Sequence, residues 1–195
     1  MTKLIIPISG YKRVGKDTCA NILADKFREG GLTVAIESFA SPMKRIIATT
    51  FGISLDDLER YKNDPANFTI SMDAPVITDF RSILQRFGVE AMRPEFGSSV
   101  WADLMVNRIR ASSADVVIIP DHRFDTELTT LLATYNNVNT LHVHSDLSSS
   151  TDNHSSEQLP TARPDRIVDN TPKDSSINDE LSSYVYEMRA KYGLQ

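Results

Sequence analysis

Apolar positions along this chain follow two patterns that alternate. Short, nearly continuous apolar runs predict buried strands at residues 4–9, 33–38, 115–120 and 140–144. Between these runs, apolar residues recur every three or four positions, which is typical of helices that cover a sheet. The run VVII at residues 116–119 is apolar throughout, as expected of a central strand covered on both faces. The alternation predicts an α/β fold with a central, mainly parallel sheet.

The spacing of the strands indicates two unusual regions in one domain of 195 residues. Helical periodicity covers residues 42–51, 78–87, 100–110 and 177–192. The first three helices fall in a connection of about residues 39–112, which is longer than a single crossover helix needs, so we interpret it as an insertion that grips a second ligand. Residues 145–176 are rich in Ser, Thr, Asp, Asn and Pro, and we expect a lid over about residues 145–170.

The sequence GYKRVGKDT at residues 10–18 fits the phosphate loop GxxxxGK, which places glycines at Gly10 and Gly15 and a lysine at Lys16. It lies between the first strand and a helical pattern, so the free amides of the helix N-terminus favour an anion. The glycines let the backbone wrap a phosphate, and Lys16 can reach the terminal one. The chain is therefore predicted to bind a nucleoside triphosphate.

The loop departs from the common pattern after its lysine, where a Ser or Thr usually ligates magnesium. Here the residue is Asp17, whose carboxylate would act through the water shell of the ion, and Thr18 can still donate to a phosphate. Lys12 and Arg13 add two cations to the loop. Such charge suits phosphoryl transfer, although a solvated basic loop is the alternative.

Further candidates lie in the expected insertion. In FASPMK, Ser41 suits a helix cap and Pro42 suits the first helical turn. Lys44, which follows Met43, would then lie near the cationic N-terminus of that helix. The alternative is an ordinary capped helix with an exposed lysine.

Arg81 and Gln85 lie four residues apart and therefore on one helix face. They could hold a phosphate and a base edge, and that helix is expected to end at Gly88. Trp101 could stack on a base, or it could be a core residue.

The segment PDHRFDTE follows the predicted central strand and supplies three candidates. Asp121 can bind magnesium through water, Arg123 can reach a phosphate, and Glu127 can hold that guanidinium. A capped helix with an internal ion pair is the alternative reading. The expected lid contributes charged side chains that could close over polyphosphate, although a solvated loop has a similar composition: His154, Glu157, Arg163 and Arg166.

Composition narrows the class of protein. The net charge of -5 argues against binding to duplex nucleic acid, which needs a concentrated basic face. The single cysteine, Cys19, fits a reducing cytosol and is expected to pack in a helix rather than act as a nucleophile. No apolar run has the length of a signal peptide or a membrane span, so a cytoplasmic protein is expected. The histidines lack zinc-ligand spacing, and a homodimer is left open.

In this order, the motifs GYKRVGKDT, FASPMK, RSILQRFG, PDHRFDTE and HSSEQLP resemble those of the bacteriophage deoxynucleoside monophosphate kinases, over about residues 3–170. The resemblance implies a P-loop kinase fold in which ATP and Mg²⁺ phosphorylate dNMPs to dNDPs. It implies that ATP is held by Gly15, Lys16, Asp17 and Thr18, and that the acceptor pocket is lined by Lys12, Lys44, Arg81, Gly88, Val89 and Trp101. Asp121, Arg123 and Glu127 would lie where the two nucleotides meet.

Two features of this chain depart from the family. The insertion before Arg81 is shorter than in larger members, and the lid similarity is loose after Pro160. Two rival functions stay open. One is another small-molecule kinase similar to phosphomevalonate or dephospho-CoA kinases, and the other is a nucleotide-binding regulatory protein without transferase activity.

Overall fold

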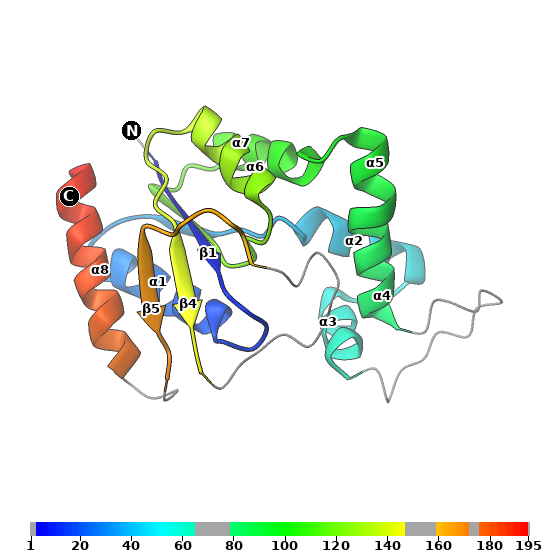
Figure 1. Ribbon diagram of the computed structural model, residues 1–195, viewed down its shortest axis with the longest axis horizontal. Helices are drawn as coiled ribbons and strands as arrows, with labels where there is room; N and C mark the ends of the chain where they lie inside the picture. The colour runs from blue at the N-terminus through cyan, green and yellow to red at the C-terminus, as the bar shows by residue number, and fades with distance from the viewer. Residues whose placement is uncertain (1–2, 65–78, 147–158, 172–175, 195) are drawn as a thin grey trace. The chain divides into compact units, whose positions relative to one another are not determined.

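The chain forms two compact units, which we call the sheet unit and the helical unit. Figure 1 shows the computed structural model, which describes residues 3–64, 79–146, 159–171 and 176–194. The sheet unit comprises Met1–Phe39 and Trp101–Gln195, and the helical unit comprises Ala40–Val100. The insertion expected over about residues 39–112 is therefore narrower, because the helix that follows Val100 packs on the sheet.

The sheet confirms the predicted α/β class. Its strands are β1 (Leu4–Ser9), β2 (Val34–Ile36), β3 (Val116–Ile119), β4 (Leu141–His144) and β5 (Arg166–Asp169). They are ordered β2-β3-β1-β4-β5, and every neighbouring pair is parallel. The four predicted strands are all present, and β2 is shorter than its apolar run. The fifth strand lies inside the stretch expected to form a lid, which corrects that expectation at its C-terminal end.

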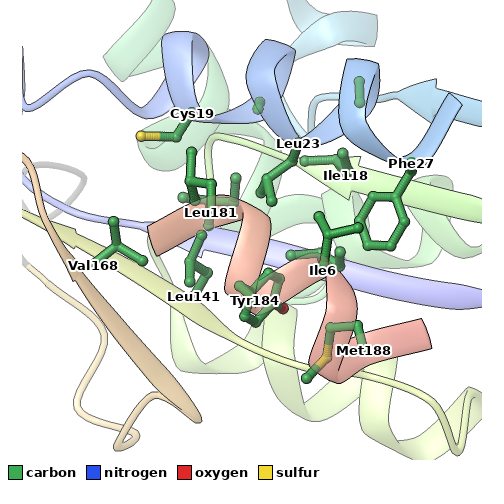
Figure 2. Packing of buried hydrophobic residues seen from close by; sticks show 14 of the residues in the cluster. Ile6, Cys19, Leu23, Phe27, Ile118, Leu141, Val168, Leu181, Tyr184 and Met188 are labelled. Atoms are coloured by element: carbon green, nitrogen blue, oxygen red, sulfur yellow. The ribbon is translucent and has the colours of Figure 1, made fainter. Parts of the chain in front are cut away.

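Helices cover both faces of the sheet because the side chains of β1 alternate between them. Leu4, Ile6 and Ile8 pack with α1 (Lys16–Glu29) and α8 (Ser176–Tyr192). Figure 2 shows this layer, in which Leu23 and Phe27 of α1 and Leu181 and Tyr184 of α8 meet around the strands.

The opposite face of the sheet carries the second core cluster. Ile5 of β1 packs there with α6 (Val100–Ala111) and α7 (Asp125–Thr134). The sheet unit is thus a three-layer arrangement that holds the carboxyl ends of its parallel strands at one edge.

The helical unit has its own small core. It contains α2 (Ser41–Phe51), α3 (Leu55–Asn63), α4 (Phe80–Gln85), the π-helix η2 (Arg86–Ala91) and α5 (Met92–Phe96). Phe80 lies at its centre, stacked on Tyr61 with 5.8 Å between ring centroids and packed edge-on against Phe51.

Two local expectations in the helical unit are wrong. The helix that begins at Phe80 does not end at Gly88, because a π-helical stretch carries the backbone hydrogen bonding past this buried glycine. Ser41 is the first helical residue of α2 and not its cap, which is Ala40 without a side-chain hydrogen bond. Pro42 does lie in the first turn, as predicted.

Among the residues that the structure describes, no helix combines the length and apolar character needed to cross a membrane.

Candidate phosphate-binding site

The predicted phosphate loop joins β1 to α1, and its two glycines are required by close contacts. The φ angle is 145° at Gly10 and 96° at Gly15, a region that L side chains rarely adopt. A Cβ atom on Gly10 would lie 2.5 Å from the backbone oxygen of Val143 in β4. One on Gly15 would lie 2.5 Å from Nδ2 of Asn170, which directly follows β5. The loop is therefore pressed against the carboxyl ends of two neighbouring strands.

Lys16 is held by the loop itself. Its Nζ donates to the backbone oxygens of Gly10, at 2.9 Å, and of Tyr11, at 2.7 Å. Lys16 is also the first residue of α1, whose N-terminus carries no side-chain cap. An ammonium group and uncapped helix amides thus occur together at the loop, which is the arrangement that binds a phosphate group.

The residues predicted to act near magnesium lie at the same helix start. Asp17 and Thr18 are exposed in the first turn of α1. In the described part of the chain, no group of three or more His, Cys, Asp or Glu side chains is placed to hold a metal. These residues fit a magnesium ion that is held mainly by phosphate oxygens and water, with few protein ligands.

The loop also contains Lys12 and Arg13, both exposed. Arg13 has a φ of 65°, so a residue other than glycine adopts the left-handed conformation within the loop. Such strained positions cluster at functional sites, since the surrounding structure must hold them.

Asn170 is a site residue that sequence reasoning missed. Its buried side chain donates from Nδ2 to the backbone oxygen of Val14, at 2.7 Å, and its backbone N–H donates to the backbone oxygen of His144, at 2.8 Å. It thus fixes the loop to the end of the sheet. Asn170 could not be recognised from the sequence because β5, the strand that it follows, was not predicted.

Sequence reasoning also missed a pair of residues that lies where the end of β1 runs beside β4. Ser9 Oγ and His142 Nδ1 are 3.0 Å apart, and the two residues are register partners. Burial lowers the pKa of His142, and the nearby charges of His144 and Lys16 lower it further. His142 is therefore held neutral beside the loop.

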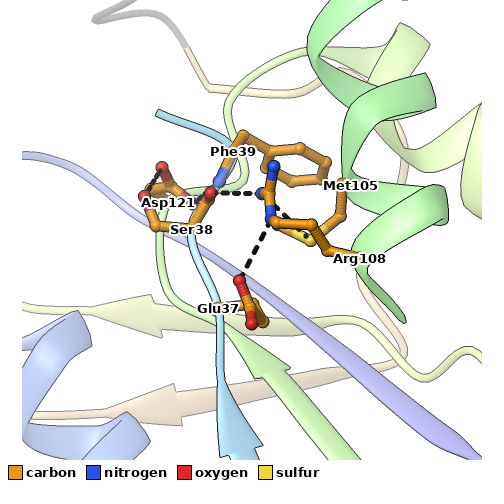
Figure 3. Close-up of polar contacts among 6 residues, drawn as sticks. All are labelled: Glu37, Ser38, Phe39, Met105, Arg108 and Asp121. Atoms are coloured by element: carbon orange, nitrogen blue, oxygen red, sulfur yellow. Dashed lines mark hydrogen bonds and ion pairs between the residues drawn. The ribbon is translucent and has the colours of Figure 1, made fainter. Parts of the chain in front are cut away.

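Asp121 lies at the end of β3, where it was predicted to bind magnesium through water. Its Oδ2 accepts the Ser38 hydroxyl at 2.6 Å, and its Oδ1 accepts the Phe39 N–H at 2.9 Å (Figure 3). A contact of this carboxylate with hydrated magnesium stays a prediction.

The same turn is held from its other side by Arg108, which was not predicted. Its guanidinium donates to Glu37 at 3.1 Å and to the backbone oxygen of Ser38 at 2.7 Å (Figure 3). Together, Asp121 and Arg108 fix the residues that follow β2.

Glu127 holds the backbone that carries Arg123. Its Oε2 accepts the backbone N–H groups of Arg123, at 2.9 Å, and Phe124, at 3.1 Å. The carboxylate is buried and caps α7, so it fixes the backbone that carries Arg123. A contact of Glu127 with the guanidinium stays a prediction.

His122 lies between Asp121 and Arg123 and is 3% exposed. Within the described residues, neither of its ring nitrogens has a hydrogen-bond partner. Burial lowers its pKa more than the Phe124 backbone and the carboxylates of Asp121 and Asp125 raise it. The imidazole is therefore held neutral.

Arg163 lies in a segment that is anchored at both ends. Asp125 accepts the Thr161 hydroxyl and the N–H groups of Thr161, at 2.9 Å, and Ala162, at 3.2 Å. Asp165 accepts the Thr140 N–H at 2.7 Å and its hydroxyl at 2.8 Å. Arg163 is exposed between these anchors, and its contact with ATP stays a prediction.

The other predicted lid residues have different outcomes. Arg166 belongs to β5 and lies 3.7 Å from Glu187 of α8, so it is part of the sheet and not of a lid. His154 and Glu157 lie outside the described residues.

The remaining candidates belong to the helical unit, apart from Trp101. Lys44 forms an ion pair with Glu59, Met43 packs against the unit's core, and Gln85 ends α4. Gly88 and Val89 lie in η2.

Trp101 lies in the first turn of α6 and is 5% exposed, which favours the interpretation as a core residue, although stacking on a base stays a prediction. That the candidates of the two units surround one pair of ligands also stays a prediction.

No model of a protein family and no curated protein matches this sequence. Several solved structures match its fold. A gluconokinase from Sinorhizobium meliloti 1021 is 12% identical, with 99% of this chain and 97% of that chain covered and a TM-score of 0.50. The APS kinase of Mycobacterium tuberculosis, in complex with AMPPNP and APS, is 14% identical, with 96% and 97% covered and a TM-score of 0.50.

A third structure, a protein from Chloroflexus aurantiacus j-10-fl assigned provisionally to the kinases, is 14% identical, with 97% of each chain covered and a TM-score of 0.52. At such identities the likeness concerns the fold. With its parallel sheet and its phosphate loop between β1 and α1, the chain has the α/β fold of the P-loop kinases.

Proposed function

We propose that this chain is a deoxynucleoside monophosphate kinase, which transfers the γ-phosphoryl group of ATP to a dNMP and supplies dNDP for phage DNA synthesis in the host cytoplasm. The observation that carries the proposal is the folded phosphate loop. In this loop, Lys16 donates to the Gly10 and Tyr11 carbonyls at a helix N-terminus that has no side-chain cap. The fold supports a small-molecule kinase, and the motif order supports the nucleotide acceptor.

In the proposed reaction, an oxygen of the acceptor phosphate attacks the γ-phosphorus in line. The bond from that phosphorus to the β,γ-bridging oxygen breaks, and the electron pair leaves with ADP. The acceptor oxygen is already ionised, so no strong general base is needed. Positioning and charge neutralisation dominate, and we assign them to Lys16 and Arg123.

The helix start and the loop would hold the phosphates of ATP through Gly10, Gly15, Lys16 and Thr18. Magnesium would add charge neutralisation between the phosphates, with Asp17 and Asp121 reaching its water shell. Glu127 keeps the backbone of Arg123 fixed, so that this guanidinium needs little reordering to meet the transferring group.

The nearest rival is a kinase with another small acceptor, because the fold is shared by kinases that act on different compounds. The Nε2 atom of Gln85 is buried and has no hydrogen-bond partner in the described part of the chain. A base edge would supply the missing acceptor, which is compatible with a nucleotide as the acceptor substrate.

An acceptor panel tests the proposal directly. Formation of ADP is measured with the four dNMPs, the four ribonucleotides, gluconate, APS, phosphomevalonate and dephospho-CoA. We expect turnover with at least one dNMP, and a loss of about a hundredfold or more in kcat for Lys16→Met. Lys191→Met, at the far end of α8, is the matched control and should retain activity.

Two results would contradict the proposal. Turnover of a different acceptor in place of every dNMP would support the rival kinase. Tight ATP binding without any acceptor-dependent ADP formation would support a regulatory protein.

A further inference from the structure

The peptide unit between Val14 and Gly15 is held at three points. The Val14 side chain is 1% exposed and packs in the core cluster that α1 and α8 form with the sheet. The backbone oxygen of Val14 accepts a hydrogen bond from Nδ2 of Asn170 at 2.7 Å. The backbone oxygen of Gly15 accepts one from the Cys19 N–H at 2.9 Å, which is the first hydrogen bond of α1. The backbone around this peptide therefore has little freedom to rotate.

The contact with Asn170 sets the direction of the Gly15 N–H. In a planar trans peptide, the carbonyl oxygen and the N–H that follows it point in opposite directions. Because the Val14 oxygen points at Asn170, the Gly15 N–H points away from that side chain. Val14 and Asn170 are buried, whereas Gly15 is half-buried, so the N–H points toward the open side of the loop. Within the described residues, it donates to no backbone oxygen.

Asn170 is firmly held in its place. Its side chain is 7% exposed, and its backbone N–H donates to the backbone oxygen of His144 in β4 at 2.8 Å. A Cβ atom on Gly15 would lie 2.5 Å from Nδ2 of Asn170, and Gly15 has a φ of 96°. The amide group thus lies beside Gly15 as well as beside the carbonyl before it. Asn170 and the second glycine of the motif therefore fix one peptide together.

A donor that is oriented before its ligand arrives strengthens binding. An N–H that donates to a phosphate oxygen forms a charge-assisted hydrogen bond, which is stronger than a neutral one. If the direction of the N–H is already fixed, little conformational freedom is lost on binding. Control of the Val14–Gly15 peptide thus bears on the affinity for phosphate, although Asn170 itself need not touch the ligand.

We infer that Asn170 is a positioning residue for nucleotide binding, because it turns the Val14–Gly15 peptide so that the Gly15 N–H meets a phosphate oxygen of ATP. The inference rests on the proposed function only for ATP as the ligand of the loop, and it is independent of the acceptor. It gives Asn170 at the end of β5, 156 residues after Val14 in the sequence, a part in holding the triphosphate.

The first test measures the affinity for phosphate chains by calorimetry, with Mg²⁺ present. Asn170→Leu keeps the approximate volume of the side chain and removes its donor. We expect this variant to raise the Kd for AMPPNP about tenfold, which corresponds to the loss of one charge-assisted hydrogen bond. The Kd for inorganic tripolyphosphate, which lacks a nucleoside, should rise by a similar factor. In steady-state kinetics, the KM for ATP should rise, and the KM for the dNMP should stay within about twofold.

Asn139→Leu is the matched control. Asn139 is also a buried asparagine whose side chain forms a hydrogen bond, since its Oδ1 accepts the Tyr184 hydroxyl at 2.8 Å. It precedes β4 and therefore lies at the opposite end of the strands from the loop. We expect a lower Tm for both variants, but an unchanged affinity for AMPPNP in Asn139→Leu. A merely structural role of Asn170 would leave that affinity unchanged in Asn170→Leu as well.

The second test observes the Gly15 N–H itself by nuclear magnetic resonance. Val14 and Gly15 form the only Val–Gly pair in the sequence, so a chain with isotope-labelled valine carbonyls and glycine nitrogens gives one correlated amide signal. Its proton should move downfield when AMPPNP binds the wild-type chain, because the N–H then donates to a phosphate. In Asn170→Leu, we expect a smaller downfield shift at saturation. Absence of this response in the wild-type chain would overturn the inference, whatever the variants show.

The outcomes separate this inference from the proposed function. If no dNMP turns over but Asn170→Leu weakens AMPPNP binding about tenfold, the function fails and the inference stands. If dNMPs turn over and Asn170→Leu matches the wild-type chain in the KM for ATP and in the Gly15 signal, the function stands and the inference fails. If neither AMPPNP nor tripolyphosphate binds the wild-type chain, both fail. If Asn170→Leu does not melt cooperatively, Asn170→Asp takes its place, because it keeps the shape of the side chain and removes the donor, with Asn139→Asp as its control.

Discussion

Gly10 illustrates how a single backbone position sets the form of the loop. Its φ of 145° is unfavourable for other residues, and a methyl group there would meet the Val143 carbonyl of β4 at 2.5 Å. That oxygen belongs to a strand and cannot move aside cheaply. We therefore expect Gly10→Ala to lower the free energy of unfolding by at least about 2 kcal/mol, measured by urea unfolding.

Gly31 provides the matched control for this prediction. It also has a positive φ, of 84°, but nothing lies within 4 Å of a Cβ built on it. Gly31→Ala should therefore show the conformational cost alone, about 1 kcal/mol. If both variants lose the same free energy of unfolding, the contact with Val143 does not contribute to the effect of Gly10→Ala.

His122 gives a pH dependence whose sign follows from its burial. Burial lowers its pKa in the folded chain below the ordinary value of 6.5. The unfolded state therefore binds more protons as the pH falls below that value, so the free energy of unfolding falls from pH 7 to pH 5. Replacing the imidazole by an untitratable side chain, in His122→Leu, should flatten this slope.

The measurement is chemical unfolding at several pH values between 5 and 7, above the range in which ordinary carboxylates become protonated. His142 also has a lowered pKa and will leave a residual slope in His122→Leu. His144, which is half exposed and pairs with Asp146, supplies the control variant His144→Gln. An unchanged slope in His122→Leu would show that another group causes it.

Site residues that are identified by a short local motif could be predicted from the sequence. Gly10, Gly15 and Lys16 were found because glycine, lysine and spacing carry the whole signal locally. Asn170 and Arg108 could not be predicted, since each acts on a segment far away in the sequence and only the fold brings it there.

At the scale of elements, apolar runs identified the strands that the sheet buries on both faces. β1 and β3 are fully buried and were therefore clear in the sequence. β5 is an edge strand of four residues with only Val168 buried, so its pattern could not be distinguished from the polar segment around it. Its absence from the prediction also hid Asn170, which follows it.

Helix boundaries were less predictable than helix positions. α6 and α8 begin and end within one residue of their apolar patterns. The helix of Arg81 continues past Gly88 because a π-helical turn accommodates the glycine, and α3 went unseen because only Leu58 of its residues is buried. Glu59 and Lys62 belong to that overlooked helix, so their ion pair emerged only from the fold.

At the scale of the whole molecule, the two units have separate cores. Two core clusters contain only sheet-unit residues, and the third contains only residues of the helical unit. Phe39 and Ala102, which lie next to the two ends of the insertion, pack in the same cluster. The sheet unit should therefore fold after removal of residues 40–100, with a short Gly/Ser linker joining Phe39 to Trp101.

We expect this shortened chain to melt cooperatively and to bind AMPPNP, yet to transfer no phosphate to a dNMP. Circular dichroism and calorimetry would measure the first two properties, with the full chain as the control. Loss of cooperative melting would show that the units stabilise each other, and retained transfer to a dNMP would place the acceptor site outside the helical unit.

The two carbonyl contacts of Lys16 bear on turnover. If the chain binds ATP as proposed, the Gly10 and Tyr11 oxygens would compete with the triphosphate for the ammonium. After the proposed transfer, the same oxygens would take the ammonium back from the shorter product. We expect this exchange to weaken the hold on ADP more than the hold on ATP, so that the loop would return to its resting arrangement as the spent nucleotide departs.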